Sequence, residues 1–205
     1  GSIRMPDKKT FDYLSQKGLR VDLCPYNKYD TIASKKDLIA LFETLDKFKD
    51  INNRPPIITF NTNTANPDFS RIKDSGFKKY YYKKFTKSFK EYYPQDNILQ
   101  IWEEGIKYGV IFPQYHHREH VNTQLWLDLL KNGNEAVMLG FDQEIFGLSF
   151  ITSSKINIPY LGSLIIKNDN AFREISKAVK EGSDIFNNTF KFRSKSFIAP
   201  LYTWS

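Results

Sequence analysis

Two short apolar runs, each followed by a polar loop and then by a helical pattern, constrain the fold more than any other feature of this sequence. Residues 57–60 (IITF) and 110–113 (VIFP) have the length and β-branched content of buried strands. Polar loops at 61–68 and 114–120 follow them, and apolar residues at helical spacing come next. Because this order repeats, the sequence predicts βα units around a parallel sheet, and hence an α/β domain.

Capping residues and periodicity predict most of the other elements. Ser34, Asp96 and Asn122 are suited to begin helices, and Gly18 and Gly109 are suited to end them. We expect helices at 7–18, 34–50, 96–109, 122–133 and 169–190, a shorter one containing Phe69 and Ile72, a last strand at 197–199 and an irregular loop at 20–33. Residues 78–93 fit a strand or a helix.

The composition is that of an ordinary globular chain, with 40% hydrophobic and 26% charged residues. Its 205 residues suit one domain, expected to span 1–205, whereas a complete eight-unit barrel usually needs about 250. Cys24 is the only cysteine, and no run of about 18 apolar residues is present. We therefore expect neither an intrachain disulfide nor a membrane span, and a cytoplasmic location.

All three histidines fall within five residues, directly after the second expected strand. Reactive groups collect at the carboxyl ends of parallel strands, and His116 and His120 would share one face if the chain turned helical there. Two imidazoles suit zinc or a similar divalent ion, although a third ligand must come from elsewhere. Asp22 and Asp142 are weak candidates for that ligand. The alternative is a set of histidines satisfied by ordinary hydrogen bonds.

His116, Glu119 and His120 also match the H-x-x-E-H pattern of a class of zinc proteases. That pattern must lie within a helix. Because the expected strand and Pro113 lie just upstream, we rank a protease low. A continuous helix over about 110–125 would favour it.

The segment Phe112–His120 (FPQYHHREH) resembles the PQ-x-H-G-R-E-H segment of a bacterial branch of the polysaccharide deacetylase superfamily. Three further segments, Cys24–Thr31, Ala65–Phe69 and Phe197–Trp204, are similar to that branch and occur in the same order. The resemblance implies a deformed or partial (β/α) barrel, a metal held by one Asp and two His, and hydrolysis of an acetyl group on a sugar. It implies that His116 and His120 are the metal ligands and that the segment from Phe197 to Tyr202 helps to line the cleft.

The sequence departs from that family in three places. The branch carries Asp-Asp-Trp directly before a stretch like Gly1–Pro6, and these carboxylates serve as base and metal ligand; neither is present here. No histidine follows His120, where the family has a late catalytic one. We therefore expect an internal fragment, truncated at both ends and inactive alone. His117 replaces a glycine of the family, which could crowd the site or add a ligand.

Other polar residues are candidates for the same cleft. Arg118 and Glu119 could form an ion pair that orients the histidines, or a simple surface pair. The candidate substrate-binding residues are Tyr26, Asn27, Asp30, Asn61, Asn63, Tyr202 and Trp204. Loop capping is a slightly better explanation for the asparagines at 61 and 63. An ordered loop packed by its own tyrosines explains Tyr26, Asn27 and Asp30 equally well.

Two other functions are carried as alternatives. One is a carbohydrate-binding barrel that has lost its chemistry. The other, distant one is a nucleic-acid-binding domain, because residues 78–90 interleave lysine with aromatics and the net charge is +7. A solvated helix face with its aromatics turned inward is the better explanation of that segment. The expected partner is thus a polysaccharide or an acetylated sugar, with nucleic acid unlikely.

Overall fold

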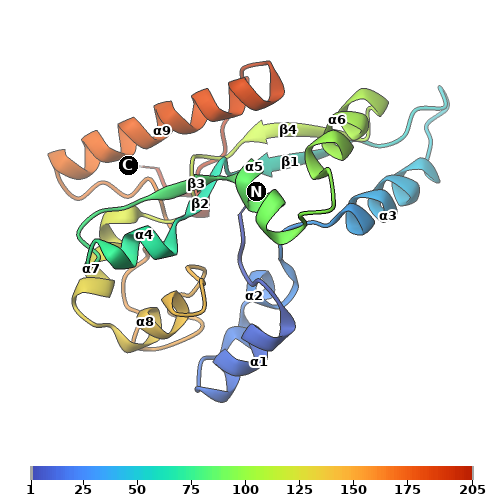
Figure 1. Cartoon of the computed structure of the whole chain (residues 1–205). Coiled ribbons are helices and arrows are strands. Elements are labelled where there is room, and N and C mark those ends of the chain that lie inside the picture. Colours follow the sequence, from blue (N-terminus) through green and yellow to red (C-terminus); the bar gives the residue numbers. More distant parts are fainter. Residues whose placement is uncertain (1, 205) are drawn as a thin grey trace.

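Two parallel strands, β1 (Ile58–Thr62) and β4 (Ile111–Tyr115), form the centre of the computed structural model, which describes residues 2–204. Ile58 is paired with Ile111 and Thr62 with Tyr115, so the two strands end side by side (Figure 1). The pairing continues past the strands, where the amide of His116 donates to the Thr62 carbonyl at 3.0 Å. Both predicted strands and their parallel arrangement are confirmed. The predicted burial of the first strand is wrong, because Ile58 and Thr59 are exposed and Phe60 is only partly buried.

A second, antiparallel pair joins β2 (Ala65–Pro67) to β3 (Tyr82–Lys84). Strand β2 lies inside the segment that the sequence predicted to be only a polar loop. The ambiguous segment 78–93 divides, because β3 is followed directly by helix α5 (Phe85–Tyr92). The fold is therefore mixed α/β, and residues 2–204 form these two-stranded sheets without a closed barrel.

Most of the remaining helices follow the predicted capping pattern with small shifts, but the helices within 20–33 and 135–165 were not predicted. The remaining helices are α1 (Lys8–Gln16), α2 (Pro25–Tyr29), α3 (Lys35–Asp46), α4 (Phe69–Asp74), α6 (Ile98–Tyr108), α7 (Thr123–Lys131), α8 (Glu135–Phe141) and α9 (Asp169–Phe190). Ser34 begins α3 with a reciprocal capping box, and Asn122 caps α7. Asn97 caps α6 in place of the predicted Asp96, because its side chain accepts from the amide of Gln100.

Two segments differ from their predictions. Residues 20–33 contain α2 and a short 3-10 turn (Val21–Leu23), whereas an irregular loop was expected. Residues 197–199 do not form the predicted strand and lead into a 3-10 turn (Pro200–Tyr202). The Ile198 carbonyl accepts from the ring of His116, so it is used by a side chain and not by a neighbouring strand.

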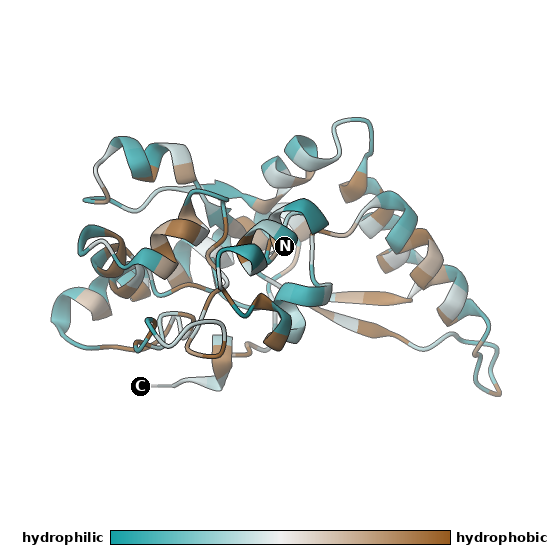
Figure 2. Ribbon diagram, turned by 90° about the horizontal axis from the view of Figure 1, so that it is seen from below, coloured by the Kyte–Doolittle hydropathy of each residue, from teal (hydrophilic) through white to brown (hydrophobic). Residues whose placement is uncertain are grey.

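The helices bury one face each against two clusters of apolar side chains. One cluster contains Trp126 of α7 and Phe141 of α8, and the other contains Ile111 of β4 and Trp102 of α6. The helices are banded teal and brown, as expected of helices that bury one side (Figure 2). Among residues 2–204, no helix is both long enough and apolar enough to span a membrane.

Trp126 is fully buried and contacts the rings of Phe69 and Phe141. We expect Trp126→Ala to lower the free energy of unfolding by about 3–5 kcal/mol, because it leaves a large cavity. Trp204→Ala is the matched control; its side chain is 67% exposed and its loss should cost less than about 0.5 kcal/mol. Urea unfolding followed by circular dichroism measures both. Equal losses would contradict the assignment of Trp126 to the core.

Candidate metal and substrate site

His116 and His120 lie immediately beyond the end of β4, on a stretch that is not helical. Helix α7 begins only at Thr123, so a helical turn does not place the two rings together. They are nevertheless close, with ring centroids 5.4 Å apart and ring planes at 65°. The absence of a helix also removes the basis of the zinc-protease interpretation, which needs the whole H-x-x-E-H pattern on one helix.

Each ring is oriented by a backbone carbonyl. His116 Nδ1 donates to the Ile198 carbonyl at 2.6 Å, and His120 Nδ1 donates to the Leu161 carbonyl at 3.0 Å. A carbonyl oxygen can only accept, so the proton of a neutral ring must sit on Nδ1. Nε2 then carries a free lone pair on both rings. Metal-binding histidines commonly use this arrangement, in which the second nitrogen donates to a carbonyl.

Burial keeps both rings neutral. Desolvation lowers the pKa of His120 to about 3, and the positive charge of Arg4 contributes in the same direction. Desolvation also lowers the pKa of His116, although its hydrogen bond to Ile198 opposes the shift. Neutral imidazole is the form that binds a metal. The site therefore requires little proton release to accept a cation at neutral pH.

Both histidines line one cavity of about 510 Å³. Of the seven predicted substrate-binding residues, five line the same cavity: Tyr26, Asp30, Asn61, Asn63 and Tyr202. Asn27 is fully buried outside its lining, and Trp204 packs on Phe197 near the surface. Segments that are far apart in the sequence thus meet at this cavity.

Asn63 has a structural contact within the site. Its side-chain amide donates to the carbonyl of His116, so it holds the backbone that carries one of the histidines. Its amide nitrogen is therefore already engaged by protein. The side chain therefore stabilises loop backbone, which resembles the capping role that the sequence favoured for the loop asparagines.

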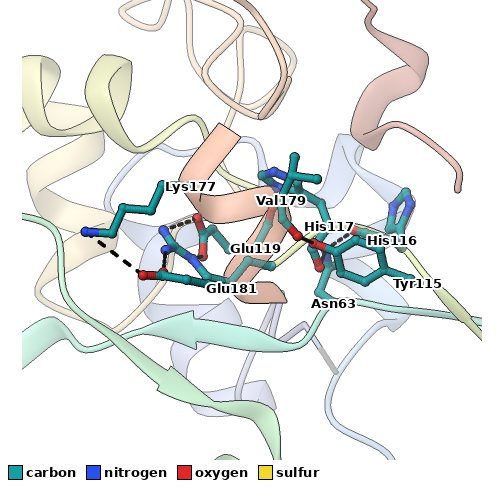
Figure 3. Close-up of polar contacts among 9 residues, drawn as sticks. Asn63, Tyr115, His116, His117, Glu119, Lys177, Val179 and Glu181 are labelled. Atoms are coloured by element: carbon teal, nitrogen blue, oxygen red, sulfur yellow. Dashed lines mark hydrogen bonds and ion pairs between the residues drawn. The ribbon is translucent and has the colours of Figure 1, made fainter. Parts of the chain in front are cut away.

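Arg118 and Glu119 form a buried ion pair, with Arg118 Nε and Glu119 Oε2 2.6 Å apart. Glu181 of α9 contacts the same guanidinium, and Lys177 lies 4.0 Å from Glu181 (Figure 3). Neither Arg118 nor Glu119 lines the histidine cavity, and the rings of His116 and His120 donate to the carbonyls of Ile198 and Leu161 instead. The pair fixes the backbone between the two histidines and does not touch their rings.

His117 adopts a backbone φ of +73°, in the region that favours glycine. This conformation explains why a glycine is suited to the position. Its Nδ1 interacts with the Glu119 carbonyl at 2.9 Å, and its ring is buried against Phe197 outside the cavity lining. His117 therefore neither crowds the cavity nor adds a ligand to it.

The described residues do not supply a third ligand. No group of three His, Cys, Asp or Glu side chains within 2–204 is arranged to hold a metal ion. Asp22 is exposed and paired with Arg20, and Asp142 is exposed and paired with Lys73, so both weak candidates were wrong. Asp30 does line the cavity, and desolvation raises its pKa against the opposing charge of Arg4.

Sequence analysis missed several parts of the site. The carbonyls of Leu161 and Ile198 carry no sequence signal, because any residue supplies a carbonyl. The segment 135–165 has no clear periodicity, yet Phe150 and Ile151 form an apolar wall of the cavity. Arg4 also lines the cavity, and its only signal was its place in a stretch similar to the family.

The lysine- and tyrosine-rich segment lies elsewhere, along a second groove of about 770 Å³. The ring of Tyr81 lies 4.2 Å from the Arg71 guanidinium and 5.3 Å from the Lys79 ammonium. Arg118 lies 4.4 Å from the ring centroid of Tyr82. These rings are already in contact with cations of the protein, so they are poorly placed to stack on bases. The expectation that nucleic acid is an unlikely partner remains a prediction.

No family model, no curated protein and no solved structure matches this chain. The likeness to the deacetylase superfamily therefore rests on the motifs described above, and its consequences for function are proposals.

The lowered pKa of His120 makes stability depend on pH. The unfolded chain takes up a proton near pH 6.5 and the folded chain does so only near pH 3, so the free energy of unfolding should fall as the pH drops below 6.5. His120→Asn keeps a donor for the Leu161 carbonyl but does not titrate. We expect it to reduce the slope between pH 6 and 5 by up to about 1.4 kcal/mol per pH unit. Denaturant unfolding at several pH values measures this, and an unchanged slope would contradict a buried neutral His120.

Proposed function

We propose that this chain is the metal-binding part of a carbohydrate deacetylase-like hydrolase. The observation that supports the proposal is the pair of Nε2 lone pairs, on His116 and His120, at one cavity. Their Nδ1 atoms are both engaged by backbone carbonyls, and their rings lie 5.4 Å apart. Zinc is one of the divalent ions that imidazole ligands suit, and it is the ion that we propose.

The proposal includes the fold. We propose that the parallel pair of β1 and β4 is one part of a deformed (β/α) barrel. The histidines follow β4 and Asn63 follows β1, so the site lies at the carboxyl ends of adjacent parallel strands. Active sites of barrel enzymes are built at that edge.

In the family that the sequence resembles, an Asp-Asp pair supplies the third ligand and the base, and these 205 residues contain no such pair. Asp30 is the one carboxylate among the described cavity residues, and it is not grouped with the histidines. The 205-residue chain alone is therefore expected to bind metal without hydrolysing substrate.

The residues of this chain have distinct roles in the proposed reaction. A bound zinc would polarise the acetyl carbonyl and favour deprotonation of a water molecule. His116 and His120 hold the ion, and Asn63 holds the backbone of His116. Tyr26 and Tyr202 border the cavity with side chains that are 58% and 84% exposed, so they can pack on a sugar ring.

A second candidate is a carbohydrate-binding barrel without chemistry. It is favoured by the absence of a third metal ligand among residues 2–204. Such a protein would bind an oligosaccharide through the same cavity and would release no acetate. The two candidates differ in whether metal affinity accompanies sugar binding.

Isothermal titration with zinc tests the proposal. His116→Ala and His120→Ala should each weaken zinc binding by at least about tenfold, since each removes a ligand. His117→Gly is the control and should bind zinc like the wild type, because His117 does not line the cavity. Equal affinity in all four proteins would refute the metal site.

A second measurement tests the chemistry. Placing Asp-Asp-Trp before Gly1 should tighten zinc binding and produce acetate release from acetylated oligosaccharides that a chelator abolishes. Zinc binding that tightens without acetate release would favour the non-catalytic candidate. Acetate release that survives both the chelator and the His116→Ala change would contradict the proposed mechanism.

A further inference from the structure

Arg4 is a buried cation that has no anionic partner among residues 2–204. Its side chain lines the histidine cavity, and the residue is only 8% exposed. No described carboxylate comes within 4 Å of its guanidinium nitrogens, and no hydrogen bond from the guanidinium to a described residue is present. Burying a guanidinium in this way costs free energy unless something supplies the missing acceptors. Desolvation accordingly lowers the pKa of Arg4.

The neighbours of Arg4 position the guanidinium without satisfying it. Its Cζ atom lies 5.5 Å from the ring centroid of Tyr26 and 5.8 Å from that of Phe146. Aromatic rings at these distances attract the cation, but they do not replace the oxygen acceptors that its N–H donors need. The five donors of the guanidinium therefore remain available for an oxyanion.

A second unsatisfied polar group lies beside it. Both side-chain polar atoms of Asn27 are buried and have no hydrogen-bond partner among the described residues. A Cβ atom at Gly147 would lie 3.2 Å from Arg4 Cδ and 3.2 Å from Asn27 Oδ1. The two side chains thus meet over a glycine, where a larger residue would crowd them.

Asp30 is the competing explanation for Arg4. It lines the same cavity, and its charge interacts with Arg4 at a distance greater than the 4 Å of an ion pair. If Arg4 served only to balance Asp30, we would expect the two groups to be in contact. A ligand carboxylate that reached Arg4 would also be repelled by Asp30. Removing the Asp30 charge strengthens carboxylate binding under either explanation, so the binding preference of the wild type decides between them.

We propose that Arg4 forms an oxyanion subsite, so that the cavity accepts a sugar that bears a carboxylate. A guanidinium binds a carboxylate through two parallel hydrogen bonds, which gives both affinity and orientation. Tyr26 lies at the guanidinium and borders the cavity, where it can pack on the same sugar ring. The choice of a sugar as the ligand rests on the proposed function, whereas the oxyanion subsite rests on Arg4. A phosphate on a sugar shares this chemistry and is distinguished by the test.

The test compares three ligands on the metal-free 205-residue chain in the presence of a chelator. They are a uronic-acid disaccharide, the matched neutral disaccharide and a sugar phosphate, each titrated by calorimetry. We expect the wild type to bind the uronate at least tenfold more tightly than the neutral sugar. Preference for the sugar phosphate over the uronate would assign the subsite to phosphate and overturn the carboxylate. Equal binding of all three, or binding of none, would overturn the subsite.

Three variants distinguish the possible causes of a uronate preference. Arg4→Met should abolish the preference, Arg4→Lys should retain part of it, and Asp30→Asn should strengthen uronate binding. A uronate preference that is absent from the wild type and appears only in Asp30→Asn would show that Arg4 serves Asp30, and would overturn the proposal. Lys79→Ala, in the separate basic groove, is the control and should bind like the wild type. Circular dichroism shows whether each variant is folded. If Arg4→Met does not fold, Arg4→Lys and Asp30→Asn test the subsite in its place.

The outcome is separable from that of the proposed function. His116→Ala should lose zinc affinity and keep the uronate preference, because the measurement is made without metal. A uronate preference in a chain that binds no zinc would support the subsite and refute the hydrolase. Zinc binding with no uronate preference would support the hydrolase and refute the oxyanion subsite.

Discussion

The candidate site depends on two hydrogen bonds, from the Nδ1 atoms of His116 and His120 to the carbonyls of Ile198 and Leu161. They fix the tautomer of both rings and leave both Nε2 atoms free. The carbonyls belong to irregular segments that are themselves held by side chains. Asn122 donates to the Ile165 carbonyl at 2.9 Å, and Ser194 accepts from the amide of Tyr115 at 3.0 Å. The packing of irregular backbone therefore decides the orientation of the histidines.

The turn between the two histidines is fixed from its other side by α9. A Cβ atom at Gly182 would lie 2.8 Å from the Cα atom of Arg118, so only glycine allows the helix to pack this closely. Glu181, the preceding residue, contacts the Arg118 guanidinium that also pairs with Glu119. A buried pair of this kind is costly to break, because the remaining partner keeps an uncompensated charge. The ion pair and the glycine thus couple α9 to the backbone conformation of the site.

The cavity is lined by neutral, cationic and anionic groups. His116 and His120 are neutral, Arg4 is a buried cation, and Asp30 is the one described carboxylate of the lining. A cation held by the histidines and an oxyanion held by Arg4 would balance each other electrostatically. Under the proposed function, the exposed Tyr26 and Tyr202 offer surfaces for a sugar ring.

The sequence by itself determined the parallel strand pair, most helix boundaries and the place of the histidines after β4, because these depend on local periodicity, capping and strand order. It could not determine that the rings meet without a helix, that carbonyls at 161 and 198 orient them, or that 197–199 is not a strand. Those facts depend on contacts between segments 40 to 80 residues apart in sequence. The lack of an ion-pair partner for Arg4 among residues 2–204 was equally hidden, since it is a property of the packed chain and not of any residue pattern.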